Sequence, residues 1–124
     1  MVDVGLLTVE QRNNALAAAL AYVQPSLMES YSLTVMESWL AGRPVLVREG
    51  SAVVEWHCER SEGGWSFGSS QQLSSQLDEL LANPQLADKM GEKGRAYVLD
   101  NYQWRDVLDR MEKDILAVAA NRRR

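Results

Sequence analysis

Apolar residues recur at the spacing of an α-helix in several segments of the chain. The first segment follows Thr8, which forms with Gln11 the Thr-x-x-Gln capping box typical of a helix start. Ser69 and Gln72 form a second capping box before a segment that places leucines on one face. The pattern predicts helices over residues 8–19, 33–41, 69–82, 85–101 and 104–118, with the glycines at 91 and 94 as weak points.

Short apolar runs between these helices predict β-strands. Pro44–Val47 is a continuous run of the kind that buried parallel strands show, and Pro25 stops the shorter run before it. A polar segment after the continuous run is expected to be irregular. The pattern places strands at residues 2–4, 21–24, 44–47 and 65–67, and the irregular segment at 49–64.

Strands that alternate with helices predict an α/β fold. We expect a partial Rossmann-like arrangement, in which a doubly wound parallel sheet is covered by helices. With 124 residues, the chain is expected to form one domain over residues 1–124. Arg122–Arg124 are expected to form a disordered, solvated tail rather than a patch for nucleic acid or lipid.

Charge and cysteine content exclude several classes of protein. The net charge of −4 argues against binding along a nucleic-acid backbone. The single cysteine, Cys58, excludes an internal disulfide and fits a reducing compartment. No apolar run approaches the roughly 18 residues that a membrane span needs, and no signal peptide is evident, so we expect a cytoplasmic protein.

Two glutamates flank a turn from a strand into a helix. Glu29 lies in the loop after Pro25, and Glu37 lies about one turn inside the helix that Ser32 is expected to cap. In open α/β sheets the ligand crevice lies off the carboxyl ends of the strands, and the first amides of a helix suit a phosphate. Because carboxylates accept hydrogen bonds from sugar hydroxyls, the pattern fits a nucleotide sugar. The residues alone also fit a solvated helix glutamate beside an unrelated loop glutamate.

The same stretch resembles a known enzyme family. Its order is Pro-Ser, a glutamate, a loop, a second glutamate and a Gly-x-Pro-Val ending, here Gly42-Arg43-Pro44-Val45. This order is similar to the carboxyl-terminal, donor-binding part of retaining glycosyltransferases of family 4, or group 1, which have the GT-B fold. The similarity covers nearly the whole chain, with further matches at Gly5-Leu6-Leu7, Glu10, Glu92-Lys93-Gly94-Arg95 and Tyr102-Gln103-Trp104.

The resemblance implies a donor site and assigns roles to its residues. The glutamate that matches Glu29 contacts the donor sugar, and the one that matches Glu37 holds the ribose hydroxyls. The loop between them offers backbone amides to the diphosphate. No metal or other cofactor is implied. The implied donor-binding residues are Glu29, Ser30, Tyr31, Ser32, Leu33 and Glu37.

Two departures from the family pattern affect this site. Ser32 stands where the family usually has glycine, and serine tolerates a positive φ less well, so we expect a displaced loop. After the second strand, Glu49-Gly50 and Glu55 match only in part a glycine-rich turn followed by a glutamate. His57 and Cys58 are adjacent in sequence and are expected in an ordinary loop rather than in a metal or nucleophile site.

The resemblance also defines what this sequence does not match. Family members have further strand–helix units, a basic pair that grips the diphosphate and an amino-terminal acceptor domain. We therefore expect a truncated domain that binds a nucleotide-diphosphate sugar weakly and is not catalytically competent alone. The alternatives are a standalone interaction module that pairs with a partner chain supplying the missing half, and a degenerate remnant without a ligand. An exposed sheet edge predicts a homo-oligomer.

Overall fold

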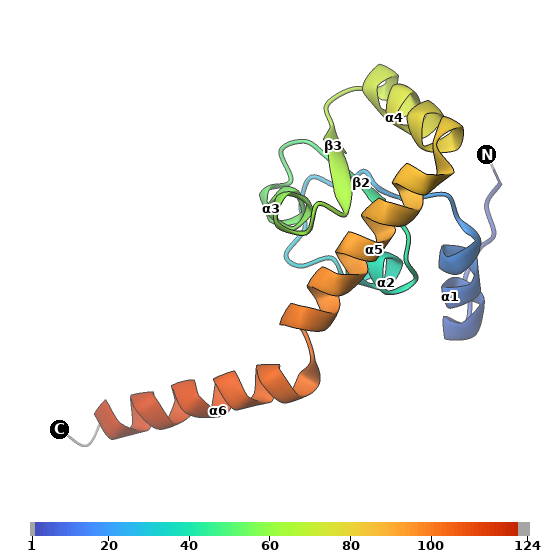
Figure 1. Ribbon diagram of the computed structural model, residues 1–124. Helices are drawn as coiled ribbons and strands as arrows, with labels where there is room; N and C mark the ends of the chain where they lie inside the picture. Colours follow the sequence, from blue (N-terminus) through green and yellow to red (C-terminus); the bar gives the residue numbers. More distant parts are fainter. Residues whose placement is uncertain (1, 122–124) are drawn as a thin grey trace.

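The computed structural model describes residues 2–121, and it shows helices and strands that alternate up to residue 82 and are followed by two further helices (Figure 1). Arg122–Arg124, where a disordered tail is expected, lie outside the described residues. The elements are α1 (Val9–Ala18), β1 (Tyr22–Gln24), α2 (Leu33–Leu40), β2 (Val45–Arg48), α3 (Ala52–Ser61), β3 (Gly64–Phe67), α4 (Ser70–Ala82), α5 (Pro84–Asn101) and α6 (Trp104–Asn121).

The strands form one three-stranded sheet in the order β1-β2-β3. Both pairs are parallel: Val23 is the register partner of Leu46, and Leu46 is the register partner of Trp65. Each strand is joined to the next by a helix, as parallel pairing requires. The predicted α/β class, with part of a Rossmann-like parallel sheet, is therefore confirmed.

The two faces of the sheet carry separate hydrophobic cores. Neighbouring residues of β2 point to opposite faces, so Val45 and Val47 enter one core and Leu46 enters the other. The first core lies against α2, α3 and the second half of α5, and the second lies against α4 and the first half of α5. Their other buried members are Val35, Met36, Trp39, Val54, Cys58 and Val98 in the first, and Phe67, Leu80, Ala87 and Met90 in the second.

The helix starts follow from the capping residues. Thr8 accepts a hydrogen bond from the Gln11 amide, and the Gln11 side chain accepts one from the Thr8 amide, which confirms the first capping box. Ser69 accepts from the Gln72 amide as expected, but the Gln72 side chain accepts from Gly68 N, one residue earlier than a capping box requires. The amides of Gln11 and Gln72, which the two caps satisfy, are among those that the first turn of a helix leaves free.

Two predictions of secondary structure are wrong. Residues 2–4 form no strand, and Val2 and Val4 are exposed. Residues 49–64 contain a ten-residue helix, α3. The helix is polar overall, yet it buries Val54 and Cys58, which are four residues apart and so lie on one face. Packing of that face onto the sheet, rather than overall composition, makes the segment helical.

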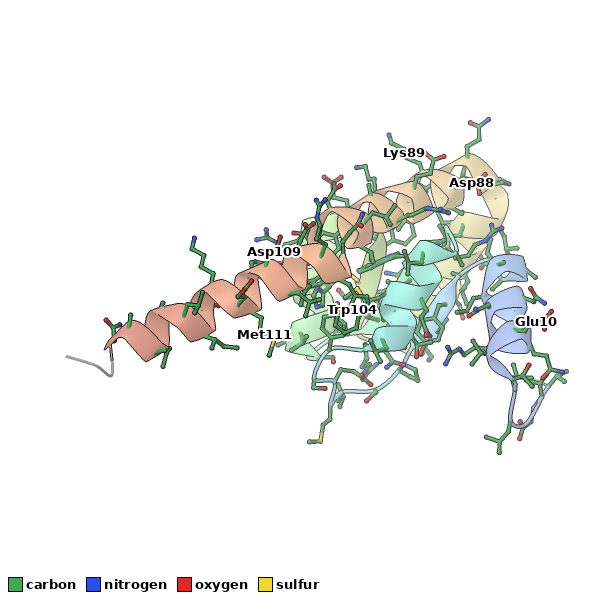
Figure 2. The ribbon with its side chains drawn as sticks, turned by 90° about the horizontal axis from the view of Figure 1, so that it is seen from below. Glu10, Asp88, Lys89, Trp104, Asp109 and Met111 are labelled. Carbon is green, nitrogen blue, oxygen red and sulfur yellow. The ribbon has the colours of Figure 1, made fainter. Side chains whose placement is uncertain are left out.

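The last helix, α6, projects away from the rest of the molecule (Figure 1). None of its residues is buried, and Asp109 and Met111 project from opposite sides of it (Figure 2). Its apolar residues nevertheless follow the predicted helical spacing. Within residues 2–121, no helix is both long enough and apolar enough to cross a membrane.

Candidate functional site

The loop after β1 is held at the carboxyl edge of the sheet by the last residue of that strand. Gln24 Nε2 donates hydrogen bonds to Glu29 Oε1 at 2.6 Å and to Ser32 Oγ at 3.2 Å. The hydroxyl of Tyr22 in turn donates to Gln24 Oε1 at 2.9 Å, which fixes the orientation of the amide. One side chain of the sheet therefore brings Glu29 and Ser32 together at the start of α2.

Ser32 adopts a left-handed backbone conformation, with φ 60° and ψ 78°. The sequence predicts that serine avoids the positive φ that glycine accepts at this point of the family pattern, and the structure shows that serine adopts it. Ser32 occupies the capping position of α2 as expected, but its hydroxyl makes no capping hydrogen bond and contacts Gln24 instead. The amides of Leu33 and Thr34, in the first turn of α2, lack intrahelical partners by the geometry of a helix start.

The second glutamate forms an ion pair with α1. Glu37 Oε1 lies 2.7 Å from Arg12 Nη2, and the two side chains are 30% and 43% exposed. The other carboxylate oxygen, Oε2, is buried and accepts no hydrogen bond from the described residues. An unsatisfied buried acceptor is costly, so a ligand hydroxyl that reached this oxygen would be favoured.

The two glutamates do not contact each other. Glu29 is held by Gln24, whereas Glu37 is held by Arg12. Burial raises the pKa of the Tyr22 phenol, and the charges on Glu29 and Glu37 raise it further, which places both carboxylates near this ring. Both carboxylates therefore lie near the Tyr22 ring, although each is held by a different partner.

Glu37 lies between two open pockets on either side of α2. One, of about 520 Å³, lies between α1 and α2 and includes Arg12 and Leu16 in its lining. The other, of about 620 Å³, lies between α2 and the junction of α5 with α6, and includes Tyr31, Leu33 and Tyr102. Two of the predicted loop residues, Tyr31 and Leu33, thus share a pocket wall with Glu37.

Three other sequence features have structural explanations. Glu55 Oε2 accepts a hydrogen bond from Gly50 N at 2.8 Å, so the partial match after β2 closes a loop. The loop expected for His57 and Cys58 is wrong, since both are buried in α3. Burial raises the pKa of the Cys58 thiol to about 12, which makes it a poor nucleophile. Within residues 2–121, no three His, Cys, Asp or Glu side chains gather to hold a metal ion.

The family model described as "Glycosyl transferases group 1" matches residues 5–97 of the chain. The chain belongs to the group 1 glycosyltransferases. The predicted resemblance to the carboxyl-terminal GT-B part of these enzymes is thereby confirmed, and the matched segment contains the whole Pro25–Val45 pattern.

Two relatives place this group 1 glycosyltransferase chain among longer proteins. It is 28% identical over 123 residues to an MMP alpha-(1->4)-mannosyltransferase of Mycolicibacterium hassiacum, which covers 92% of this chain and 29% of that protein. Its fold matches a sucrose-phosphate synthase from Thermosynechococcus elongatus with a TM-score of 0.83 and 23% identity, over 95% of this chain and 30% of that one. The chain thus spans less than a third of the length of either relative.

Arg12 and Gln24 were not identified from the sequence. Gln24 sits at the end of a strand that the sequence does predict, but nothing in its spacing shows that it bonds to Glu29 and Ser32. Arg12 lies 25 residues before its partner Glu37. Only the packing of α1 beside α2 joins these two side chains.

Proposed function

We propose that this group 1 glycosyltransferase chain binds a nucleoside-diphosphate sugar as the donor side of a glycosyl-transfer reaction. The observation that carries the proposal is the backbone of Ser32. It keeps the positive φ that glycine supplies in the family pattern, even though a serine must be strained to do so. This conformation turns the chain into α2 with the free amides of Leu33 and Thr34 at the strand end, where an anionic ligand is favoured.

Each part of a nucleotide sugar has a chemical counterpart in this arrangement. The diphosphate would accept hydrogen bonds from the loop Ser30–Leu33 and the first turn of α2. Glu29, which Gln24 holds in place, would accept hydrogen bonds from hydroxyls of the sugar. Glu37 has one carboxylate oxygen without a partner among the described residues, and this oxygen would accept hydrogen bonds from the ribose hydroxyls.

We further propose that the chain is not catalytically competent by itself. Loss of a diphosphate leaving group needs cations that neutralise its charge. Arg12, which lies beside Glu37 of the predicted site, is already paired with that carboxylate. Relatives have more than twice this length outside the matched region, so acceptor binding and charge neutralisation are assigned to that remainder.

The proposal is tested by ligand-observed NMR with UDP-, GDP- and ADP-sugars on the wild type and on two variants at Ser32. We expect millimolar binding of one donor, worth about 4 kcal/mol. Ser32→Gly and Ser32→Ala both lose the hydroxyl, but only glycine takes a positive φ freely, so Ser32→Gly should bind about fivefold more tightly than Ser32→Ala.

The matched control is Ser75, an exposed residue in the middle of α4. Ser75→Gly and Ser75→Ala should bind the donor equally. No sugar should be released from any donor in these samples. Absence of binding in the wild type would contradict the donor site, and turnover that disappears in Glu29→Ala would contradict the proposed lack of competence.

A second candidate function is an interaction module, and α6 is the observation that favours it. Leu108, Met111, Ile115 and Val118 recur at spacings of three and four residues, and each is more than half exposed. An apolar stripe of this kind is typical of a helix that packs against another chain or segment. The sheet adds two edges, since β1 and β3 each have one neighbour within the described residues.

This second candidate predicts self-association or a partner chain that supplies the remaining part of the enzyme. We expect light scattering at about 100 μM to show a homo-oligomer, because mass action favours assembly at that concentration. Ile115→Glu, in the middle of the stripe, should shift the protein to a monomer, whereas Lys113→Glu on the polar side should not. A wild-type monomer at that concentration would contradict self-association.

A further inference from the structure

Four rings pack together behind the loop that leads into α2, and we call them the aromatic cluster: Tyr31, His57, Tyr97 and Tyr102. They come from the loop, from α3, from α5 and from the residue that ends α5. His57 Nδ1 lies 2.9 Å from the Tyr97 hydroxyl, and that hydroxyl lies 3.2 Å from the Tyr102 hydroxyl. This chain of hydrogen bonds therefore links α3 to α5 and to the residue that ends α5.

Tyr31 is the member that reaches the candidate site. Its ring packs edge-on against His57, with centroids 5.6 Å apart, and edge-on against Tyr102, with centroids 5.5 Å apart. Such edge-to-face pairs contribute about 0.5–1.5 kcal/mol beyond simple burial. Tyr31 makes no side-chain hydrogen bond within this chain of contacts, so ring packing is what fixes it.

The cluster is uncharged near neutral pH. Burial lowers the pKa of His57, which keeps the imidazole neutral. Burial also raises the pKa of Tyr97, and its hydrogen bond to Tyr102 raises it further. A neutral network that satisfies its own polar atoms rigidifies the packing around it.

Ser32 follows Tyr31 directly, and its positive φ needs support from both sides. A strained backbone conformation persists only where the surrounding structure over-determines it. Gln24 holds the Ser32 hydroxyl from the sheet side. On the other side, the ring of Tyr31 is clamped between His57 and Tyr102.

We propose that Tyr102, held by Tyr97 and His57, is a positioning residue that fixes Tyr31 and thereby aims the backbone amides of Ser32 and Leu33 at the diphosphate. The inference rests on the proposed function for the identity of the ligand. The part of the inference that concerns the position of the loop depends only on the contacts of the aromatic cluster. Tyr102 acts through Tyr31 and touches no reacting atom.

The test compares UDP, GDP and ADP with uridine, guanosine and adenosine, since only the first three carry a diphosphate. Tyr102→Ala should weaken binding of the preferred diphosphate about fivefold and leave binding of its nucleoside within about twofold. Tyr102→Phe keeps the ring on Tyr31 and should restore most of the affinity. Leu99→Ala, on an exposed position of α5, is the control and should change neither ligand.

A second measurement needs no ligand. Tyr102→Ala should shift the NMR resonances of the Ser32 and Leu33 amides and speed their hydrogen exchange, and Leu99→Ala should not. Unmoved amides, or parallel weakening of nucleoside and diphosphate, would overturn the positioning role. If the amide resonances shift in Tyr102→Ala but the wild type binds no diphosphate, Tyr102 still controls the loop. The role in diphosphate binding is then overturned, together with the proposed function.

Discussion

Replacing Gly94 with alanine should lower the free energy of unfolding by about 1–3 kcal/mol, the range measured for overpacked cores. A Cβ at this position would overlap the indole ring of Trp39. That ring is fully buried, and its Nε1 donates to Gly63 O at 2.9 Å, so it has no free direction in which to move. The helix propensity of alanine favours the change by only about 1 kcal/mol, so the steric term decides the sign.

The measurement is urea unfolding followed by circular dichroism, with the midpoint and slope compared between variants. Lys89→Ala, on the outer side of the same helix (Figure 2), is the control and should change stability by no more than about 0.5 kcal/mol. Trp39→Leu makes room beside Gly94, so Gly94→Ala should be less harmful in that background. A Gly94→Ala protein as stable as the wild type would show that α5 can move away from α2.

The role of Gly94 could be predicted from the sequence only in part. From the sequence, glycine in a helix is a weak point, and residue 94 is predicted to be one. In the structure, the missing side chain lets α5 approach Trp39 closely, so the same residue is required for packing. Periodicity predicts that a helix exists here, but it does not show which of its positions touches another helix.

Local signals predicted the elements best where they were strong. The Thr8 cap and the apolar run of β2 appear as expected, and the helix predicted over residues 33–41 is observed as α2. The helix α3 could not be predicted in this way, because its buried positions include His57 and Ser61, which read as polar surface. His57 contacts Tyr97 of α5, which lies 40 residues further along the chain.

The positions of the loop and of the start of α2 were predictable from the sequence, but the contacts of the candidate residues were not. The pattern that contains Glu29, Ser32 and Glu37 locates the loop and the start of α2 correctly. It does not show that Gln24 joins Glu29 to Ser32 or that Arg12 pairs with Glu37. Both contacts depend on tertiary packing, which the periodicity of a single sequence does not reveal.

The pairing of Arg12 with Glu37 leads to the second large prediction. Glu37→Ala should weaken binding of the preferred nucleoside diphosphate about tenfold, the scale of a hydrogen bond to a charged group. Arg12→Ala removes the ion pair but keeps the carboxylate. Because Oε1 is then open to the ribose hydroxyls as well as Oε2, we expect binding as tight as in the wild type or up to about threefold tighter. Loss of the partly exposed ion pair itself should cost at most about 1 kcal/mol of stability.

The 2′-deoxy form of the same nucleotide assigns the contact to the ribose. The wild type and Arg12→Ala should prefer the ribonucleotide to the deoxynucleotide about tenfold, since only the former offers the 2′-hydroxyl to the carboxylate. Glu37→Ala should bind both equally, and Glu112→Ala, an exposed residue of α6, should behave as the wild type. If the wild type bound the ribonucleotide and the deoxynucleotide equally, Glu37 would not contact the ribose. Its carboxylate would then be only a structural partner of Arg12.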